Sequence, residues 1–136
     1  MTETLWASVF NQKDGLYKLD NIPFYVPSVA CNDIVFAEFD EAEGFITFRE
    51  VTSQSGNSTI QVVILDKSVL TNDLRDVFDH LGCSSEKFDE GYFVIDVPTD
   101  TEYGPIKKRL SELQQHVIID YAESCLSDKH RKMNGF

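Results

Sequence analysis

The first half of the chain consists of short apolar segments separated by polar turns. Aromatic and β-branched residues, which favour strands, dominate four of these segments: residues 4–10, a run that begins at Leu16, residues 33–39 and residues 45–51. Residues 12–15 and 40–44 lie between them and end in glycine, which suits tight turns. This pattern predicts that residues 1–58 form a small SH3-like β-barrel or a curled antiparallel sheet.

After residue 58 the pattern changes to strands alternating with helices. Residues 59–65 are strongly β-forming. The next segment ends at Gly82, and its apolar side chains follow helical spacing: Leu70, Leu74, Val77, Phe78 and Leu81. Residues 83–88 and 92–97 predict two strands on either side of a turn.

A second helix and a last strand complete this half. Thr99 and Glu102 fit a capping box ahead of a helix that carries Ile106, Leu110 and Leu113, and residues 116–121 predict a strand. The order strand, helix, strand, strand, helix, strand is that of a ferredoxin-like split βαβ unit, which we assign to residues 59–123. Residues 124–136 are expected to form a polar tail, frayed or helical. The predicted fold class is therefore α+β.

Charge narrows the range of partners. The chain has 23 acidic and 12 basic residues and a formal net charge of -11. Because Lys129, Arg131 and Lys132 gather near the C-terminus, the body before them is more negative still. Such a surface repels nucleic acid and anionic lipid and attracts basic proteins, although solubility alone also explains an acidic surface. No apolar run approaches the roughly 18 residues that span a bilayer, so we expect a cytoplasmic protein.

Residues that carry chemistry are few. His80 is expected in the last turn of the first helix, His116 at the start of a strand and His130 in the tail, and none belongs to a catalytic or metal-binding motif. The turn at residues 55–59 lacks the lysine of a phosphate-binding loop. Cys31, Cys83 and Cys125 lack CxxC spacing and are expected to be reduced, mostly buried thiols. We expect no metal, no cofactor and no catalytic activity.

The segment LDNIPF, residues 19–24, and a few other residues are expected to serve the fold and not chemistry. In LDNIPF, Asp20 and Asn21 suit a turn, and Pro23 holds Ile22 extended so that Ile22 and Phe24 can enter the barrel core. With these we group the other residues expected to serve the fold: Trp6, Ser55 and Gly56.

Four motifs in order give the chain a family resemblance. They are Leu5-Trp6-Ala7, Tyr17 with the LDNIPF segment, Asp33-Ile34-Val35, and Ser55-Gly56 with Ser58-Thr59. Together they resemble an uncharacterised bacterial family of domains of unknown function, with a link to immunity proteins of polymorphic or contact-dependent toxins. The resemblance implies histidine in the middle of the SGxST turn, where this chain has Asn57, so the most plausible general base is absent.

The favoured functional hypothesis is an immunity protein that binds and neutralises a basic toxin, such as a nuclease, through acidic side chains. The expected partner-binding residues are acids of both halves: Asp33, Glu38, Asp40, Glu41, Glu43, Asp73, Asp76, Asp79, Asp89 and Glu90. One alternative is a small hydrolase that uses Asp20, Asn21 and the turn at residues 55–59. Another is a regulatory domain that binds a small ligand between helices and sheet.

Overall fold

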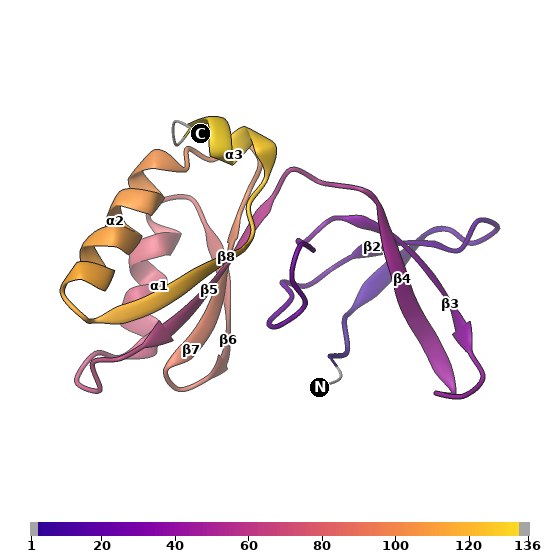
Figure 1. Ribbon diagram of the computed structural model, residues 1–136, viewed down its shortest axis with the longest axis horizontal. Helices are drawn as coiled ribbons and strands as arrows, with labels where there is room; N and C mark the ends of the chain where they lie inside the picture. Colours follow the sequence, from indigo (N-terminus) through magenta and orange to yellow (C-terminus); the bar gives the residue numbers. More distant parts are fainter. Residues whose placement is uncertain (1–2, 134–136) are drawn as a thin grey trace.

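The computed structural model describes residues 3–133 as two antiparallel four-stranded sheets with helices against the second (Figure 1). The first sheet has the order β1-β2-β3-β4. Its strands are β1 (Ala7–Asn11), β2 (Leu16–Leu19), β3 (Ile34–Asp40) and β4 (Phe45–Ser53). Within the described residues β1 and β4 do not pair, so the sheet stays open. The SH3-like barrel is therefore wrong, and the antiparallel sheet is the correct alternative.

The β3–β4 hairpin projects away from the rest of the molecule (Figure 1). Its register shifts twice, because Val35 pairs with Val51 whereas Ile34 pairs with Ser53, and a second shift follows between Phe36 and Ala37. Each shift leaves an extra residue on β4, as in a β-bulge, which bends and twists a strand.

The second sheet has the order β6-β7-β5-β8. Its strands are β5 (Ser58–Ile64), β6 (Ser84–Asp89), β7 (Tyr92–Val97) and β8 (Ile119–Cys125), and neighbouring strands run antiparallel. The predicted alternation of strands and helices is present, but the last strand begins later than expected.

The expected start of β8 at His116 is wrong because a turn intervenes. His116 instead caps the C-terminus of α2 (Gly104–Gln115), and Val117 adopts a left-handed conformation with φ 58°. Ile118 then donates its N–H to the carbonyl of Leu113 at 3.0 Å, which closes the helix end. A β-branched residue is unusual in this conformation, so no residue type at this position signals a turn.

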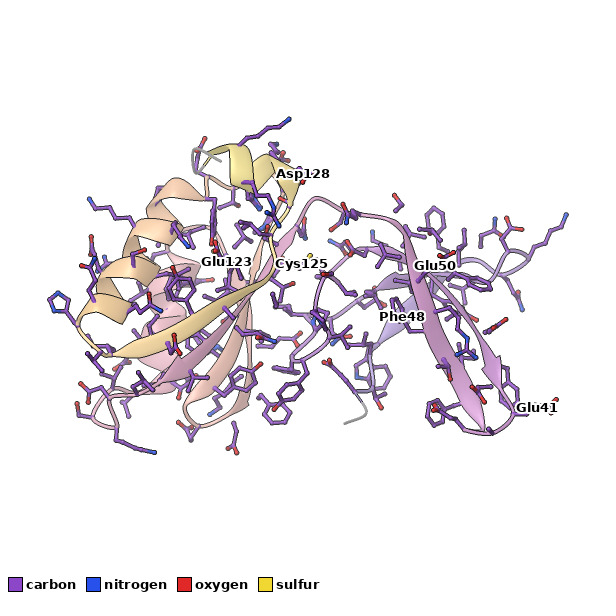
Figure 2. All side chains as sticks on the ribbon, in the orientation of Figure 1. Glu41, Phe48, Glu50, Glu123, Cys125 and Asp128 are labelled. Carbon is purple, nitrogen blue, oxygen red and sulfur yellow. The ribbon has the colours of Figure 1, made fainter. Side chains whose placement is uncertain are left out.

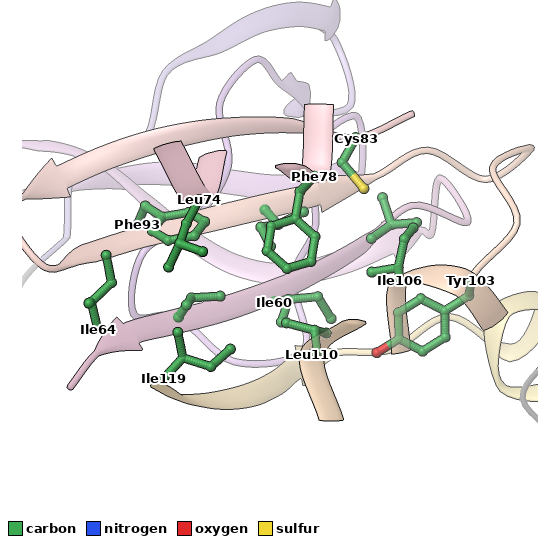
Figure 3. Packing of buried hydrophobic residues seen from close by; sticks show 13 residues of the cluster. Ile60, Ile64, Leu74, Phe78, Cys83, Phe93, Tyr103, Ile106, Leu110 and Ile119 are labelled. Atoms are coloured by element: carbon green, nitrogen blue, oxygen red, sulfur yellow. The ribbon is translucent and has the colours of Figure 1, made fainter. Parts of the chain in front are cut away.

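Helices α1 (Thr71–Asp79) and α2 pack on the face of the second sheet that looks away from the first (Figure 1). Phe78 and Leu110 are fully buried against Ile60 and Phe93 of the sheet (Figure 3). The rings of Phe78 and Phe93 lie 6.4 Å apart. Burial of large side chains at this interface is the main source of stability for this half.

The expected capping box at Thr99 and Glu102 is wrong. Helix α2 begins at Gly104, and its N-cap residue Tyr103 makes no capping bond through its side chain. The N–H of Thr99 instead donates to the side-chain oxygen of Asn57 at 3.1 Å. Thr99 therefore joins the linker between the sheets to the end of β7.

The segment between β2 and β3 covers the other face of the second sheet. Gln61 donates to the carbonyl of Phe24 at 2.8 Å, and Thr59 donates to the carbonyl of Val29 at 3.4 Å. The ring of Phe24 lies 5.0 Å from that of Phe88. Ile22 is buried as expected, but Phe24 packs against the second sheet and not in a core of the first.

The C-terminal segment folds back onto the second half. After β8, the short helix α3 (Asp128–Met133) follows, and His130 is fully buried. Its ring contacts the hydroxyl of Ser58 at 2.5 Å and the carbonyl of Pro98 at 3.1 Å. Residues 124 and 125 of the predicted polar tail belong to β8, whereas residues 128–133 are helical and are fixed to the start of β5 through His130.

Candidate functional site

The β3–β4 hairpin gathers four of the expected partner-binding acids. Glu38 and Asp40 end β3, and Glu41 and Glu43 form the turn, where they are exposed; Figure 2 shows Glu41 at the tip. The Asp40 carboxylate accepts N–H bonds from Ala42 at 2.9 Å and Glu43 at 3.3 Å, so it shapes the turn itself. Acids that are local in sequence are therefore also local in space.

Arg49 is the base that contacts this acidic group. Its guanidinium lies 3.0 Å from Glu38 and 3.2 Å from Asp40. Hydrogen bonding from Arg49 holds the pKa of Asp40 below its usual range. Exposed ion pairs of this kind stabilise little, so their role here is to orient the carboxylates. Glu41 and Glu43 remain without a basic neighbour among the described ion pairs.

Large apolar side chains share the hairpin with these acids. Phe39 is 61% exposed, Phe45 51%, Ile46 52% and Phe48 38%. The register pairs Phe39 with Ile46, and Ala37 with Phe48, so these residues share one face of the hairpin. A groove of about 300 Å³ lies beside this face, between β4 and the segment that contains Trp6. Apolar surface of this kind is typical of a docking surface.

The other expected acids belong to a different surface. Asp73, Asp76 and Asp79 are exposed on α1, Asp89 ends β6, and Glu90 lies in the turn between β6 and β7. Glu90 contacts Lys87 at 2.7 Å and accepts a bond from Thr71 at 3.0 Å. Helix α1 and the β3–β4 hairpin lie at opposite ends of the molecule (Figure 1). The ten acids therefore do not form a single site.

Asp33 is not a surface residue, contrary to expectation. Its side chain is 1% exposed and accepts N–H bonds from Ala30 at 2.9 Å and Ser55 at 2.8 Å. The carboxylate thus fastens the linker before β5 to the end of the loop before β3. A surface role for Asp33 is excluded because a buried, fully hydrogen-bonded carboxylate cannot meet a partner.

The LDNIPF segment makes hydrogen bonds to Trp6, a partner distant in sequence. The side chain of Asn21 accepts the N–H of Trp6 at 2.7 Å, and the N–H of Asp20 donates to the carbonyl of Trp6 at 2.8 Å. Trp6 itself is 77% exposed, so its backbone, not its ring, carries the structural contact. The motif joins the segment before β1 to the end of β2.

The SGNST turn is also occupied by internal bonds. Ser55 donates to the carbonyl of Cys31 at 2.8 Å, and Gly56 has φ 88°. Asn57 contacts both carboxylate oxygens of Asp96, at 3.3 and 3.4 Å. The side chains of Ser55 and Asn57, which a hydrolase would have used, bind the linker to Cys31 and to Asp96 respectively, whereas the bonds of Asp20 and Asn21 lie within the first half.

Asp96 is the carboxyl of this region whose pKa departs most from its ordinary value. Burial raises its pKa to about 6, against the lowering effect of hydrogen bonds from Asn57 and Ser84. The negative charges of Asp33 and Glu86 raise it further. Perturbed carboxyls mark many active sites, but Asp96 is only 6% exposed, so substrate cannot reach it.

The Ser58–His130 pair was not expected from the sequence. The contacts fit a neutral ring that donates from Nε2 to Pro98 and accepts from Ser58 at Nδ1, and burial lowers the pKa of His130. Ser58 also accepts the N–H of Ser127 at 2.9 Å. Both side chains of the pair are 0% exposed, which excludes a serine nucleophile that meets substrate. No sequence signal relates residues so far apart.

The three thiols of the described chain are not suited to chemistry. Burial raises the pKa of Cys31 and Cys125 to about 11 and of Cys83 to about 12, so these thiols are poorly reactive. A polar hollow of about 330 Å³ lies beside Cys125 and Asp128, two of the residues labelled in Figure 2. Within residues 3–133, no cluster of His, Cys, Asp or Glu could hold a metal.

The chain is similar to one protein family and to one solved structure among those compared. A family model described as a domain of unknown function (DUF4265) matches residues 3–121. A crystal structure of a hypothetical protein from Neisseria gonorrhoeae is 28% identical, with a TM-score of 0.79, and the match covers 92% of this chain and 84% of that chain. No curated protein matches. In the described residues no helix is long and apolar enough to cross a membrane.

Proposed function

The chain belongs to the DUF4265 family of domains of unknown function, and from its own surface we propose that it is a small acidic module that docks onto a basic protein. The docking surface would be the β3–β4 hairpin, and the proposed partner is a basic toxin, such as a nuclease, which the protein would neutralise as its immunity protein. The observation that carries this proposal is the projection of one hairpin with both acids and exposed aromatic side chains.

The two kinds of side chain would have different tasks. Glu41 and Glu43 at the tip would speed capture of a basic partner, because opposite charges raise association rates. They would also occupy the positions of substrate phosphates in a nuclease cleft. Phe39, Ile46 and Phe48 would supply affinity, since burial of an aromatic or aliphatic side chain stabilises a complex by roughly 1.5 to 3 kcal/mol.

Two finer features accompany the proposal. A ferredoxin-like arrangement of the second half is supported by the strand order β6-β7-β5-β8, with α1 after β5 and α2 after β7. A cytoplasmic location is supported by Cys31, Cys83 and Cys125, which are free thiols, because oxidising compartments favour disulfides.

A charge-reversal experiment tests the docking surface. The chain is co-expressed with the basic protein encoded beside its gene, and both complex formation and relief of toxicity are measured. Reversal of Glu41 and Glu43 to lysine should weaken the complex at least about tenfold, and added salt should weaken the wild-type complex. Reversal of Asp73 and Asp76 to lysine is the matched control, because it changes the net charge equally on the other surface.

The outcomes separate the surfaces. If both reversals weaken binding equally, the overall charge and not the hairpin attracts the partner. If only the Asp73 and Asp76 reversal weakens complex formation, the docking surface lies on the second half. Binding that ignores salt, or a neighbouring gene product without toxicity, would contradict the immunity role.

A further inference from the structure

Three consecutive backbone N–H groups converge on one carboxylate near the start of the chain. Phe24 donates to one oxygen of Glu3 at 2.7 Å, and Tyr25 and Val26 donate to the other at 3.0 Å each. Adjacent N–H groups that point into one concavity form an anion-binding nest, and bonds to a charged acceptor are among the stronger hydrogen bonds. The nest therefore recognises both oxygens of a planar carboxylate.

The nest is held in shape without Glu3. Pro23 and Pro27 flank the three donors, and each proline restricts the backbone beside it. The carbonyl of Phe24 accepts bonds from Gln61 and from the hydroxyl of Tyr92, which fix the nest to the second sheet. A site that is anchored through its other groups can stay formed when its occupant leaves.

The occupant is held through a short tether. The backbone of Trp6 is fixed by Asn21 and Asp20, whereas Glu3 lies three residues earlier. Residues 3–5 precede the first residue of β1, so Glu3 can leave the nest without unpairing a strand. The structure thus combines a preformed acceptor site with an occupant that can be displaced.

A hollow of about 410 Å³ adjoins the nest. Tyr25 belongs to both, and Val63, Tyr92 and Ala122 add apolar wall on the same face of the second sheet as the segment between β2 and β3. The rings of Tyr25 and Tyr92 lie 5.7 Å apart. A molecule whose carboxylate entered the nest could therefore lay an attached apolar group against these side chains.

We propose that Glu3 is the built-in occupant of a carboxylate-binding site, and that a small acid bearing an apolar group binds the same three amides when Glu3 leaves. The net charge of -11 repels a doubly charged phosphate more strongly than a singly charged carboxylate. The three amides lie outside the β3–β4 hairpin, although Glu3 also lines the groove beside Phe45 and Ile46, and the proposal does not rest on the docking function.

Rescue of a Glu3→Ala variant tests the site. The variant should unfold at least about 4 °C below wild type, because three N–H groups lose a charged acceptor. Phenylacetate at tens of millimolar, at constant ionic strength, should restore at least half of this loss and leave wild type unchanged. Phenylacetamide, which has the same shape without the charge, should restore nothing.

Two further measurements locate the effect. In the Glu3→Ala variant, phenylacetate should shift the amide resonances of Phe24, Tyr25 and Val26 more than any others. A Glu50→Ala variant, which removes an exposed glutamate elsewhere, should gain no stability from phenylacetate. If the Glu3→Ala variant does not fold in chloride buffer, the fraction of folded protein is measured after addition of phenylacetate or phenylacetamide. Only phenylacetate should then restore folding.

Equal effects of phenylacetate and phenylacetamide would overturn the proposal, as would amide shifts centred away from residues 24–26. Stronger rescue by inorganic phosphate than by phenylacetate would overturn the carboxylate class. A failure here leaves the hairpin experiment unaffected, because Glu3 and the amides of residues 24–26 lie off the hairpin.

Discussion

Replacement of Asp96 by asparagine should make the protein more stable at neutral pH and remove part of its pH dependence. The folded protein holds the pKa of this carboxyl near 6, mainly through burial, whereas the ordinary value is 3.8. A difference of about two pKa units corresponds to about 3 kcal/mol between the protonated and ionised forms. Because folding raises the pKa of Asp96, its contribution to the free energy of unfolding is complete below pH 3.8. This contribution is lost as the pH rises through 6.

The partners of Asp96 make asparagine a suitable replacement. The amide of Asn57 donates to the carboxylate, and the side-chain oxygen of asparagine can accept the same bond. The variant keeps the shape of the side chain and removes its charge. At pH 7 we therefore expect the variant to match or exceed wild type by up to about 3 kcal/mol, while at pH 4 the two should be nearly equal.

Urea unfolding followed by circular dichroism between pH 4 and pH 7 measures this difference. Subtraction of the wild-type free energy of unfolding from that of the variant at each pH removes the other titrating groups. An Asp73→Asn variant, exposed on α1, controls for removal of one negative charge. A difference that does not change with pH, or a variant that loses stability toward pH 7, would refute the assigned effect of burial on Asp96.

Other local features give further predictions. Val117→Asn should stabilise the protein by about 1 kcal/mol in urea unfolding, because Val117 is 66% exposed in a left-handed conformation that asparagine tolerates; a loss of stability would show that the turn is not strained. Gly56→Ala should cost at least about 2 kcal/mol, since the new Cβ would lie 2.6 Å from the Thr99 hydroxyl at φ 88°. The double variant with Thr99→Ala should recover only part of that loss, and full recovery would mean that the backbone conformation costs nothing. Ser58→Ala should cost about 2 kcal/mol and speed hydrogen exchange in α3, because His130 and the N–H of Ser127 lose a buried partner; unchanged exchange would show that this pair does not hold the helix.

The sequence predicted elements well where local pattern and local structure coincide. Strand β7 (Tyr92–Val97) occupies the predicted residues, because a glycine turn precedes it and its apolar run is uninterrupted. The start of β8 was missed because Val117, a residue that favours strands, takes a turn conformation that glycine or asparagine normally signals. The expected uncharacterised family was confirmed over residues 3–121.

The candidate site was predictable only in part. The acids of the β3–β4 turn could be grouped because they are neighbours in the sequence. Asp33 looks like these acids in sequence, and its burial depends on N–H groups that only the folded linker supplies. The burial of His130 and the capture of Glu3 rest on partners 72 and at least 21 residues away, which no local pattern reveals. Whether the hairpin docks onto a toxin stays a prediction.

The position of β5 has a consequence for synthesis on the ribosome. The strands of the first sheet pair in sequence order, so they can associate as they emerge. Strand β5, in contrast, lies between β7 and β8, and its first residue is fastened by His130. A nascent chain that lacks β8 leaves one edge of β5 bare, and bare edges invite pairing with other chains. The second half therefore stays vulnerable to aggregation until β8 has left the ribosome and paired with β5.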